Sequence, residues 1–225
     1  MGYLEDSIRM IQGIVFDLDG TLVDSLGVTF DAFNHGILQA GGKKHTPDEI
    51  MHYFGTGEDE IFKQILGQDS APQAFSEFRD YMDAHLTQVP LHSGAGDLLE
   101  KLKSKAVPIS IFTGRSWDTT EMILRYHGLL DRFITIVAHD HVDFPKPSPA
   151  GLHIALSKMK LQPTEVLFVG DSPVDMMASR AAGAPGVAAL WDLLAKRELM
   201  APHAPSHWAT QPQQVWEIYE ELSGL

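Results

Sequence analysis

The hydrophobic residues of this chain fall into short, unbroken runs, and a polar loop follows most of them. The run GIVF at 13–16 ends in DLDGT, the run at 107–112 ends in TGRS, and the run at 166–169 ends in GDSPVD. Runs of four to six apolar residues that stop at Gly, Asp or Ser predict buried strands. Predicted strands span 13–16, 107–112, 133–137, 166–169 and 187–190, with a short sixth candidate at 207–210.

Helical patterning fills the intervals between these runs. The predicted helices span about 94–105, 117–127, 149–160, 174–182 and 212–223. Strands that alternate with single helices predict an α/β fold, a doubly wound, Rossmann-like parallel sheet covered on both faces. In such sheets the ligand lies beyond the carboxyl ends of the strands. Four of the five main strand ends are polar here, which predicts a site at that edge.

One interval is too long for a single crossover helix. More than 80 residues separate DLDGT from the second strand, and the part from 24 to 92 has helical patterning, as in FDAFNHGILQA and FSEFRDYMDAHL. We therefore predict an inserted α-helical cap domain at 24–92 and a catalytic core made of 1–23 and 93–225. The cap contains eleven acidic and four basic residues.

Composition and charge exclude several classes. The 225 residues include no cysteine, which excludes a disulfide scaffold, a cysteine nucleophile and a thiolate metal site. A net charge of −13 argues against nucleic acid or an anionic membrane as the main partner. The first 13 residues resemble no signal peptide, and no run of 18 apolar residues occurs. The expected location is cytoplasmic, and the residues predict no oligomeric state.

Aspartates follow the first and fourth predicted strands. Asp17 and Asp19 are two residues apart in DLDGT, and Asp171 and Asp175 lie in GDSPVD. Carboxylates this close either share a proton or hold a cation. A single aspartate after a strand more often caps the next helix. Two pairs at one sheet edge favour an all-oxygen site of the kind that suits Mg²⁺.

Candidate phosphate ligands follow the second and third strands. Thr113 and Gly114 offer a hydroxyl and a backbone N–H to a phosphoryl oxygen, although Thr-Gly after a strand is also a common helix cap. Lys146 lies between prolines in FPKPSP, and such prolines fix the backbone. We interpret Lys146 as a fixed cation for an anion.

The segments DLDGTLVDS, TGR, KPSP and GDSPVD, in this order, resemble the four motifs of the haloacid-dehalogenase (HAD) superfamily. The chain is most similar to the phosphoglycolate-phosphatase-like group, whose helical cap follows the first motif. The resemblance implies that Asp17 is the nucleophile that forms an aspartyl-phosphate and that Asp19 is the general acid and base. It implies phosphate ligands at Thr113, Gly114 and Lys146. It also implies that Mg²⁺ is held by Asp17, Asp171 and the Asp19 carbonyl, and that Asp175 supports these ligands or reaches the ion through water.

The function that this resemblance implies is a Mg²⁺-dependent phosphatase of a small phosphorylated metabolite, such as phosphoglycolate or a sugar phosphate. A sugar-phosphate mutase on the same scaffold is the alternative. Mutase relatives commonly have Glu before the fourth-motif Asp, whereas this chain has Gly170. Dehalogenases lack the second aspartate of the first motif, and Asp19 is present. A third interpretation is a signalling receiver domain, but such a domain is about half as long and has no cap. A fourth is a catalytically silent binding protein, but that protein would not need all the key side chains.

Several residues permit two interpretations. Arg115 could reach a substrate carboxylate or phosphate, or could be solvated or cap a helix. The segment 54–57, FGTG, is either a substrate-facing loop or a plain turn. For His139–Asp140–His141 we favour a solvated loop over a metal site. Lys43, Lys44, Lys63 and Arg79 are the only cap cations, and most of them should lie on the surface.

Overall fold

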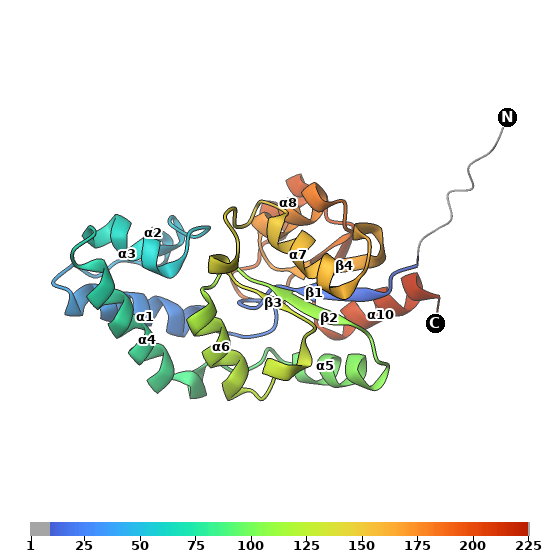
Figure 1. The fold of residues 1–225 in the computed structure, drawn as a ribbon, viewed down its shortest axis with the longest axis horizontal. Helices are drawn as coiled ribbons and strands as arrows, with labels where there is room; N and C mark the ends of the chain where they lie inside the picture. The colour runs from blue at the N-terminus through green and yellow to red at the C-terminus, as the bar shows by residue number, and fades with distance from the viewer. Residues whose placement is uncertain (1–9, 225) are drawn as a thin grey trace.

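The computed structural model describes residues 10–224 and contains the predicted parallel α/β sheet (Figure 1). All the strands are parallel, in the order β3-β2-β1-β4-β5-β6. Their bounds are β1 Gly13–Phe16, β2 Ile109–Phe112, β3 Ile136–Val137, β4 Val166–Gly170, β5 Gly186–Ala189 and β6 His207–Ala209. The α/β class, the doubly wound sheet and the helical insertion after β1 are thereby confirmed.

Helices cover both faces of the sheet, with α7 and α8 on one and α5, α6 and α10 on the other (Figure 1). The core helices are α5 Ala95–Ser104, α6 Trp117–Tyr126, α7 Ala150–Met159, α8 Pro173–Ala182, α9 Arg197–Met200 and α10 Gln213–Ser223. Short 3₁₀ turns occur at Leu86–Gln88, Leu130–Arg132, His139–His141, Pro163–Glu165 and Ala201–His203. The short helix α9 was not predicted.

Two strands are shorter than predicted because their first residues complete the preceding turns. The N–H of Val107 donates to the carbonyl of Leu102 at 3.0 Å and closes the end of α5, so β2 begins only at Ile109. Phe133 ends the 3₁₀ turn that precedes β3, and β3 keeps only two of the five predicted residues. Apolar character alone does not separate a strand from the buried turn that leads into it.

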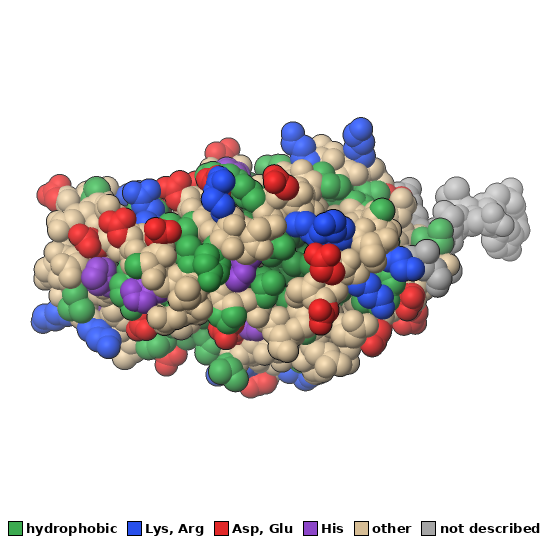
Figure 2. Space-filling view, turned by 90° about the horizontal axis from the view of Figure 1, so that it is seen from below, with side chains coloured by type: hydrophobic (Ala, Val, Ile, Leu, Met, Phe, Trp, Pro, Cys, Tyr) green, Lys and Arg blue, Asp and Glu red, His purple; other side chains and the backbone are tan. Residues whose placement is uncertain are grey.

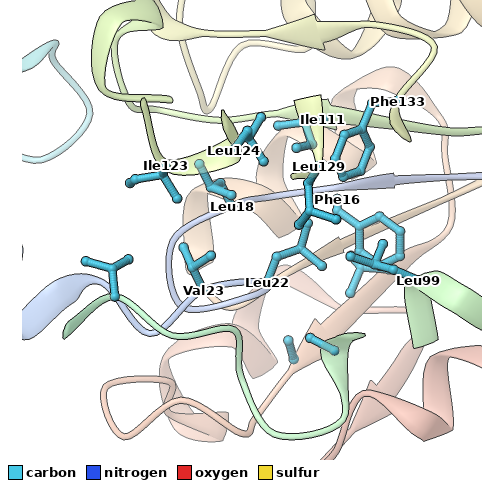
Figure 3. Packing of buried hydrophobic residues seen from close by; sticks show 14 of the residues in the cluster. Phe16, Leu18, Leu22, Val23, Leu99, Ile111, Ile123, Leu124, Leu129 and Phe133 are labelled. Atoms are coloured by element: carbon cyan, nitrogen blue, oxygen red, sulfur yellow. The ribbon is translucent and has the colours of Figure 1, made fainter. Parts of the chain in front are cut away.

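The aspartates of the first motif are held by the apolar residues between and before them. Phe16 and Leu18 are fully buried, and Figure 3 shows both in a cluster with Leu99, Ile111 and Leu124. Successive residues of an extended chain point in opposite directions, so burying Phe16 and Leu18 directs Asp17 and Asp19 away from this cluster. The hydrophobic contacts therefore set the direction of the two carboxylates.

The insertion after β1 is a small helical unit at one end of the molecule (Figure 1). It contains α1 Leu26–Gln39, α2 Pro47–Met51, α3 Glu58–Leu66 and α4 Ala71–Ala84. Phe33, Phe62 and Phe78 are buried at its centre, with ring centroids 4.7–5.8 Å apart. The segments that lead into and out of this helical unit lie side by side, because the N–H of Asp24 donates to the carbonyl of Pro90 at 2.9 Å. The domain boundaries at 23/24 and 92/93 stay a prediction.

Acidic and basic side chains are interspersed on the face of the molecule that Figure 2 shows. No helix within residues 10–224 has the length and apolar character needed to cross a membrane. The expectation that the N-terminus is no signal peptide concerns a segment that lies mostly outside the described residues, as do residues 1–9 of the predicted core.

Two glycines of α1 give a matched test of cap packing. A Cβ at Gly36 would lie 2.3 Å from the carbonyl oxygen of Ala74 in α4, whereas one at Gly27 would meet nothing within 4 Å. We expect Gly36→Ala to lower the free energy of unfolding by about 1–3 kcal/mol, since α1 and α4 must separate. Gly27→Ala should change it little or raise it by up to about 1 kcal/mol. Urea unfolding measures both, and equal effects would contradict the close helix contact.

Candidate active site

The loops after β1, β2 and β4 and the loop before α7 meet at the carboxyl edge of the sheet. They line one cavity of about 410 Å³, which the cap residues close from the other side. This is the edge where the polar strand ends predicted a site. Every residue predicted for catalysis, phosphate or metal lines this cavity except Asp175, which lies buried behind it.

Three carboxylates lie together at the centre of this edge. Asp17, Asp171 and Asp175 each place one carboxylate oxygen within 4.8 Å of an oxygen of the other two. The close approach of Asp171 to the first motif depends on Gly20, whose φ is +70°. A Cβ at Gly20 would lie 2.3 Å from Asp171 Oδ2, so no other residue fits there. Glycine adopts such a backbone conformation without steric cost.

Lys146 joins two of the three carboxylates. Its Nζ lies 2.8 Å from Asp17 Oδ1 and 2.7 Å from Asp175 Oδ1, and its side chain is only 4% exposed. Burial disfavours the ammonium ion, but the charges of Asp17 and Asp175 outweigh burial and raise the pKa of Lys146 above its ordinary value. Lys146 therefore carries a permanent positive charge in the site.

One ammonium does not neutralise this cluster. The pKa of Asp17 is raised to about 7, mainly by burial; the charge of Lys146 opposes this shift and the charge of Asp175 adds to it. Burial, followed by the charge of Asp17, also raises the pKa of Asp171 well above its usual range. Protons on the cluster thus offset its excess negative charge. A bound divalent cation would supply the same positive charge and replace these protons.

The donor set fits a hard divalent ion. Asp175 already accepts hydrogen bonds from Lys146 and from the N–H and hydroxyl of Ser172, so it supports the site by holding Lys146 in place. Asp17 Oδ1 accepts from Lys146 and from the N–H of Leu18, whereas Oδ2 accepts no hydrogen bond from the described residues. Asp171 accepts only one side-chain contact from the described part of the chain, from Thr21 at 3.3 Å. Oxygens of Asp17 and Asp171 therefore remain for a metal, and carboxylate oxygens suit Mg²⁺.

Arg115 makes a contact that the sequence did not suggest. Its guanidinium is 3% exposed and forms a bidentate ion pair with Asp19, with Nε 3.0 Å from Oδ2 and Nη2 2.8 Å from Oδ1. Nη2 also donates to Thr29 of α1 at 2.8 Å. Burial favours neutral Asp19, but the charge and hydrogen bonds of Arg115, helped by Ser25, hold the pKa of this carboxyl below its ordinary value. Arg115 is neither solvated nor a helix cap here.

A cap carboxylate completes this network. Glu58 is the first residue of α3 and is buried; its Oε1 lies 3.6 Å from Nη1 of Arg115. It also accepts from the N–H of Ser116 at 2.8 Å and the hydroxyl of Thr119 at 2.9 Å, at the N-terminus of α6. A carboxylate is favourable at a helix N-terminus. Glu58 therefore attaches the cap to the core beside the site. The sequence FGTGEDE contains no signal that distinguishes Glu58 from its acidic neighbours, so this role was not predicted.

The remaining predicted residues can now be placed. Thr113 and Gly114 line the cavity, and the Thr113 hydroxyl accepts the N–H of Arg115 at 3.1 Å. Phe54, Gly55 and Thr56 line it from the cap, which favours the substrate-facing interpretation of that loop.

The segment 139–141 does not converge on an ion. The Oδ1 atom of Asp140 accepts from the N–H of Trp117 at 2.8 Å, and His141 is exposed beside the Trp117 ring. His139 is half-buried against the cap at Gly57. The segment therefore supports α6 and the cap.

Comparison with known proteins agrees with this geometry. The model of the haloacid dehalogenase-like hydrolase family matches residues 14–189. The chain belongs to the haloacid dehalogenase-like hydrolases. A phosphoglycolate phosphatase of Yersinia pseudotuberculosis is 31% identical over 185 residues, which are 79% of this chain and 80% of that protein. The pyrophosphatase PpaX of Bacillus velezensis is 27% identical over 194 residues, 86% of this chain and 89% of that one.

A solved structure supports the same fold. The crystal structure of a predicted phosphoglycolate phosphatase from Haemophilus somnus superposes with a TM-score of 0.82 at 24% identity and covers 92% of this chain and 97% of that one. This chain is thus a HAD hydrolase of the phosphoglycolate phosphatase and PpaX-like kind, with a helical insertion after β1 and an acidic cluster consistent with the family's metal site.

The Arg115 network predicts a large loss of stability on mutation. Arg115→Gln leaves the buried Glu58 and the half-buried Asp19 without their cation and should lower the free energy of unfolding by about 3–5 kcal/mol. The control is Arg79→Gln. Arg79 also joins cap to core, 2.6 Å from Asp118, but both side chains are more than a third exposed, so the loss should be at most about 1 kcal/mol. Urea unfolding compares the two variants, and similar losses would contradict a structural role for Arg115.

Proposed function

We propose that this HAD hydrolase is a Mg²⁺-dependent phosphatase that hydrolyses a small organic phosphate monoester through an aspartyl-phosphate on Asp17. The observation that carries the proposal is the position of Asp17. Its Oδ1 is fixed by Lys146 and by the N–H of Leu18, while Oδ2 accepts no hydrogen bond from the described residues and the side chain lines the cavity. A carboxylate held in this way is oriented for nucleophilic attack.

In the first step, an oxygen of Asp17 attacks phosphorus and the bond from phosphorus to the ester oxygen breaks. The departing oxygen takes a proton from Asp19, and the free alcohol leaves. In the second step, Asp19 removes a proton from water, the water oxygen attacks phosphorus, and the bond to Asp17 breaks. Inorganic phosphate is released, and both aspartates return to their starting states.

The negative charges of Asp17 and of the phosphate repel each other, and the site must offset this repulsion. We assign Lys146, the Thr113 hydroxyl and the Gly114 N–H to the phosphoryl oxygens. Asp17, Asp171 and the Asp19 carbonyl would hold Mg²⁺, with Asp175 behind them. When bound, the ion supplies positive charge that stabilises the phosphoryl oxygens in the transition state.

The contact between Arg115 and Asp19 bears on the order of events. In this conformation Asp19 is held as an anion, which suits its role as the base of the second step. To act as the acid of the first step, Asp19 must gain a proton, which the charge of Arg115 opposes. Substrate binding therefore has to weaken this contact before the ester bond breaks.

Gly170 supports hydrolysis over the mutase alternative. A Cβ at this position would lie 2.4 Å from Cγ of Asp175. Mutase relatives commonly carry a glutamate at this position, directly before Asp171, and its side chain would clash with Asp175 of the Lys146–Asp175 pair. The relatives named above make phosphoglycolate and pyrophosphate the first substrates to test, followed by sugar monophosphates.

Two variants test the assignment of the aspartates. Asp19→Asn keeps the backbone carbonyl but removes the transferable proton, so hydrolysis of alkyl phosphates should fall about 10²–10⁴-fold. An aryl phosphate with a good leaving group should still phosphorylate Asp17 and give a burst followed by slow turnover. Rapid-quench kinetics and intact-protein mass spectrometry measure both effects.

Asp17→Asn is the matched control, because it changes the same group two residues earlier. It should give neither burst nor covalent phosphate with either substrate. Equal losses for aryl and alkyl phosphates in Asp19→Asn, without a burst, would contradict the acid–base role. Covalent phosphate in Asp17→Asn would contradict the nucleophile.

A further inference from the structure

Many of the side chains that line the cavity are apolar. They come from both the cap and the core: Leu26, Phe33, Met51, Phe54 and Ile61 from the cap, and Pro145, Pro173, Val174, Leu194 and Leu199 from the core. Phe33 and Ile61 are buried in the packing of the cap, whereas Phe54, Leu194 and Leu199 are 42%, 38% and 52% exposed and leave apolar surface open to a ligand. A leaving group beside these three side chains would contact hydrocarbon.

The buried cations of the cavity are already paired. Lys146 lies between Asp17 and Asp175, and Arg115 lies between Asp19 and Glu58. Arg115 still faces Glu58 when its contact with Asp19 weakens, so neither cation is left without a carboxylate partner that a second anionic group of a substrate could replace.

The cap supplies no cation to the cavity lining within the described residues. Lys63 pairs with Asp59 and Glu60 at 2.8 and 3.2 Å, and Arg79 pairs with Asp118. Lys43 and Lys44 are exposed and lie outside the lining. The lining contains one further cation from the described part of the chain, the exposed Lys196 at the rim.

The charged group that the cap does contribute is acidic. Glu58 lines the cavity and is 7% exposed at its side chain. An anionic leaving group would lose its water next to Glu58 and gain no buried cation in return, which is unfavourable. An apolar leaving group gains from leaving water at the same place.

We infer that the leaving group of this enzyme's substrate is uncharged and largely apolar, an aryl or branched alkyl group, rather than one that carries a second carboxylate or phosphate. The inference rests on the proposed phosphatase activity and narrows its substrate class. It places phosphoglycolate and pyrophosphate, which both carry a second anionic group, among the poorer substrates.

The test compares two esters that differ in charge but hardly in size, 4-carbamoylphenyl phosphate and 4-carboxyphenyl phosphate. We expect kcat/KM to be at least about tenfold higher for the uncharged ester, in the presence of Mg²⁺. A wild-type enzyme that prefers the carboxylate would overturn the inference. If that preference also disappeared in Lys196→Gln, Lys196 would be the anion receptor.

A charge introduced into the lining should change this preference. Leu199→Lys places an ammonium in the apolar part and should reduce the preference for the uncharged ester at least fivefold. Leu193→Lys is the matched control, because Leu193 is 97% exposed, lies in the segment that leads into α9 and is outside the cavity lining. It should keep the wild-type ratio. Equal ratios in both variants would show that the apolar part does not contact the leaving group.

Binding of non-hydrolysable analogues separates this inference from the proposed activity. Calorimetry with 4-carbamoylbenzylphosphonate and 4-carboxybenzylphosphonate, each with Mg²⁺, requires no turnover. Tighter binding of the uncharged phosphonate, without hydrolysis of either ester, would retain the preference of the cavity for an uncharged apolar group and refute the phosphatase. Hydrolysis of both esters with the carboxylate preferred would retain the phosphatase and refute the inference.

Discussion

The position of one buried ammonium group determines how the site of this HAD hydrolase is built. Lys146 lies between Asp17 and Asp175 at 2.8 and 2.7 Å, and both carboxylates are almost fully buried. Without it, the three clustered carboxylates would have no cation in contact with them, which is very costly in a protein interior. Two strand ends and the loop before α7 must therefore come together in one arrangement, and that arrangement leaves an oxygen of Asp17 accessible from the cavity.

A second ion network connects this site to the cap. Arg115 follows β2 in the core, yet it contacts Thr29 of α1 and lies beside Glu58 of α3. The same guanidinium holds Asp19. A movement of the cap thus changes the surroundings of the residue that we propose as the acid and base, and a change at Asp19 alters what holds the cap. The cap also supplies much of the apolar lining, so closure and substrate choice depend on the same contacts.

The sequence predicted most of the fold because its signals are local. A short apolar run followed by DLDGT or GDSPVD contains both the strand and the polar edge, and the long interval after the first motif predicted the insertion. The starts of β2 and β3 were wrong, because buried turn residues such as Val107 and Phe133 are as apolar as strand residues. The short helix α9 has too few residues to give a periodic pattern.

The site was predictable only where a motif defines it. Asp17, Asp171 and Lys146 each follow a strand, and parallel strands end at one edge, so their meeting could be expected. The pairing of Arg115 with Asp19 and Glu58 could not. These residues are 96 and 57 positions from Arg115, and the contact with Glu58 depends on how the cap sits on the core. The charge and spacing of a lone arginine do not show which carboxylate it will meet.

We propose that the carboxylate cluster is a divalent metal site whose missing charge is partly replaced by protons. A pKa of about 7 means that metal-free Asp17 is increasingly protonated below pH 7 and anionic above it, so protons and Mg²⁺ compete at low pH. The direct measurement is calorimetric titration of the metal-free protein with Mg²⁺ between pH 5.5 and 8.5, in buffers that differ in ionisation enthalpy. We expect one site, with proton release and an affinity that rises with pH up to about 7–8, and much weaker binding in Asp171→Asn. Binding that is independent of pH and unchanged in Asp171→Asn would contradict it.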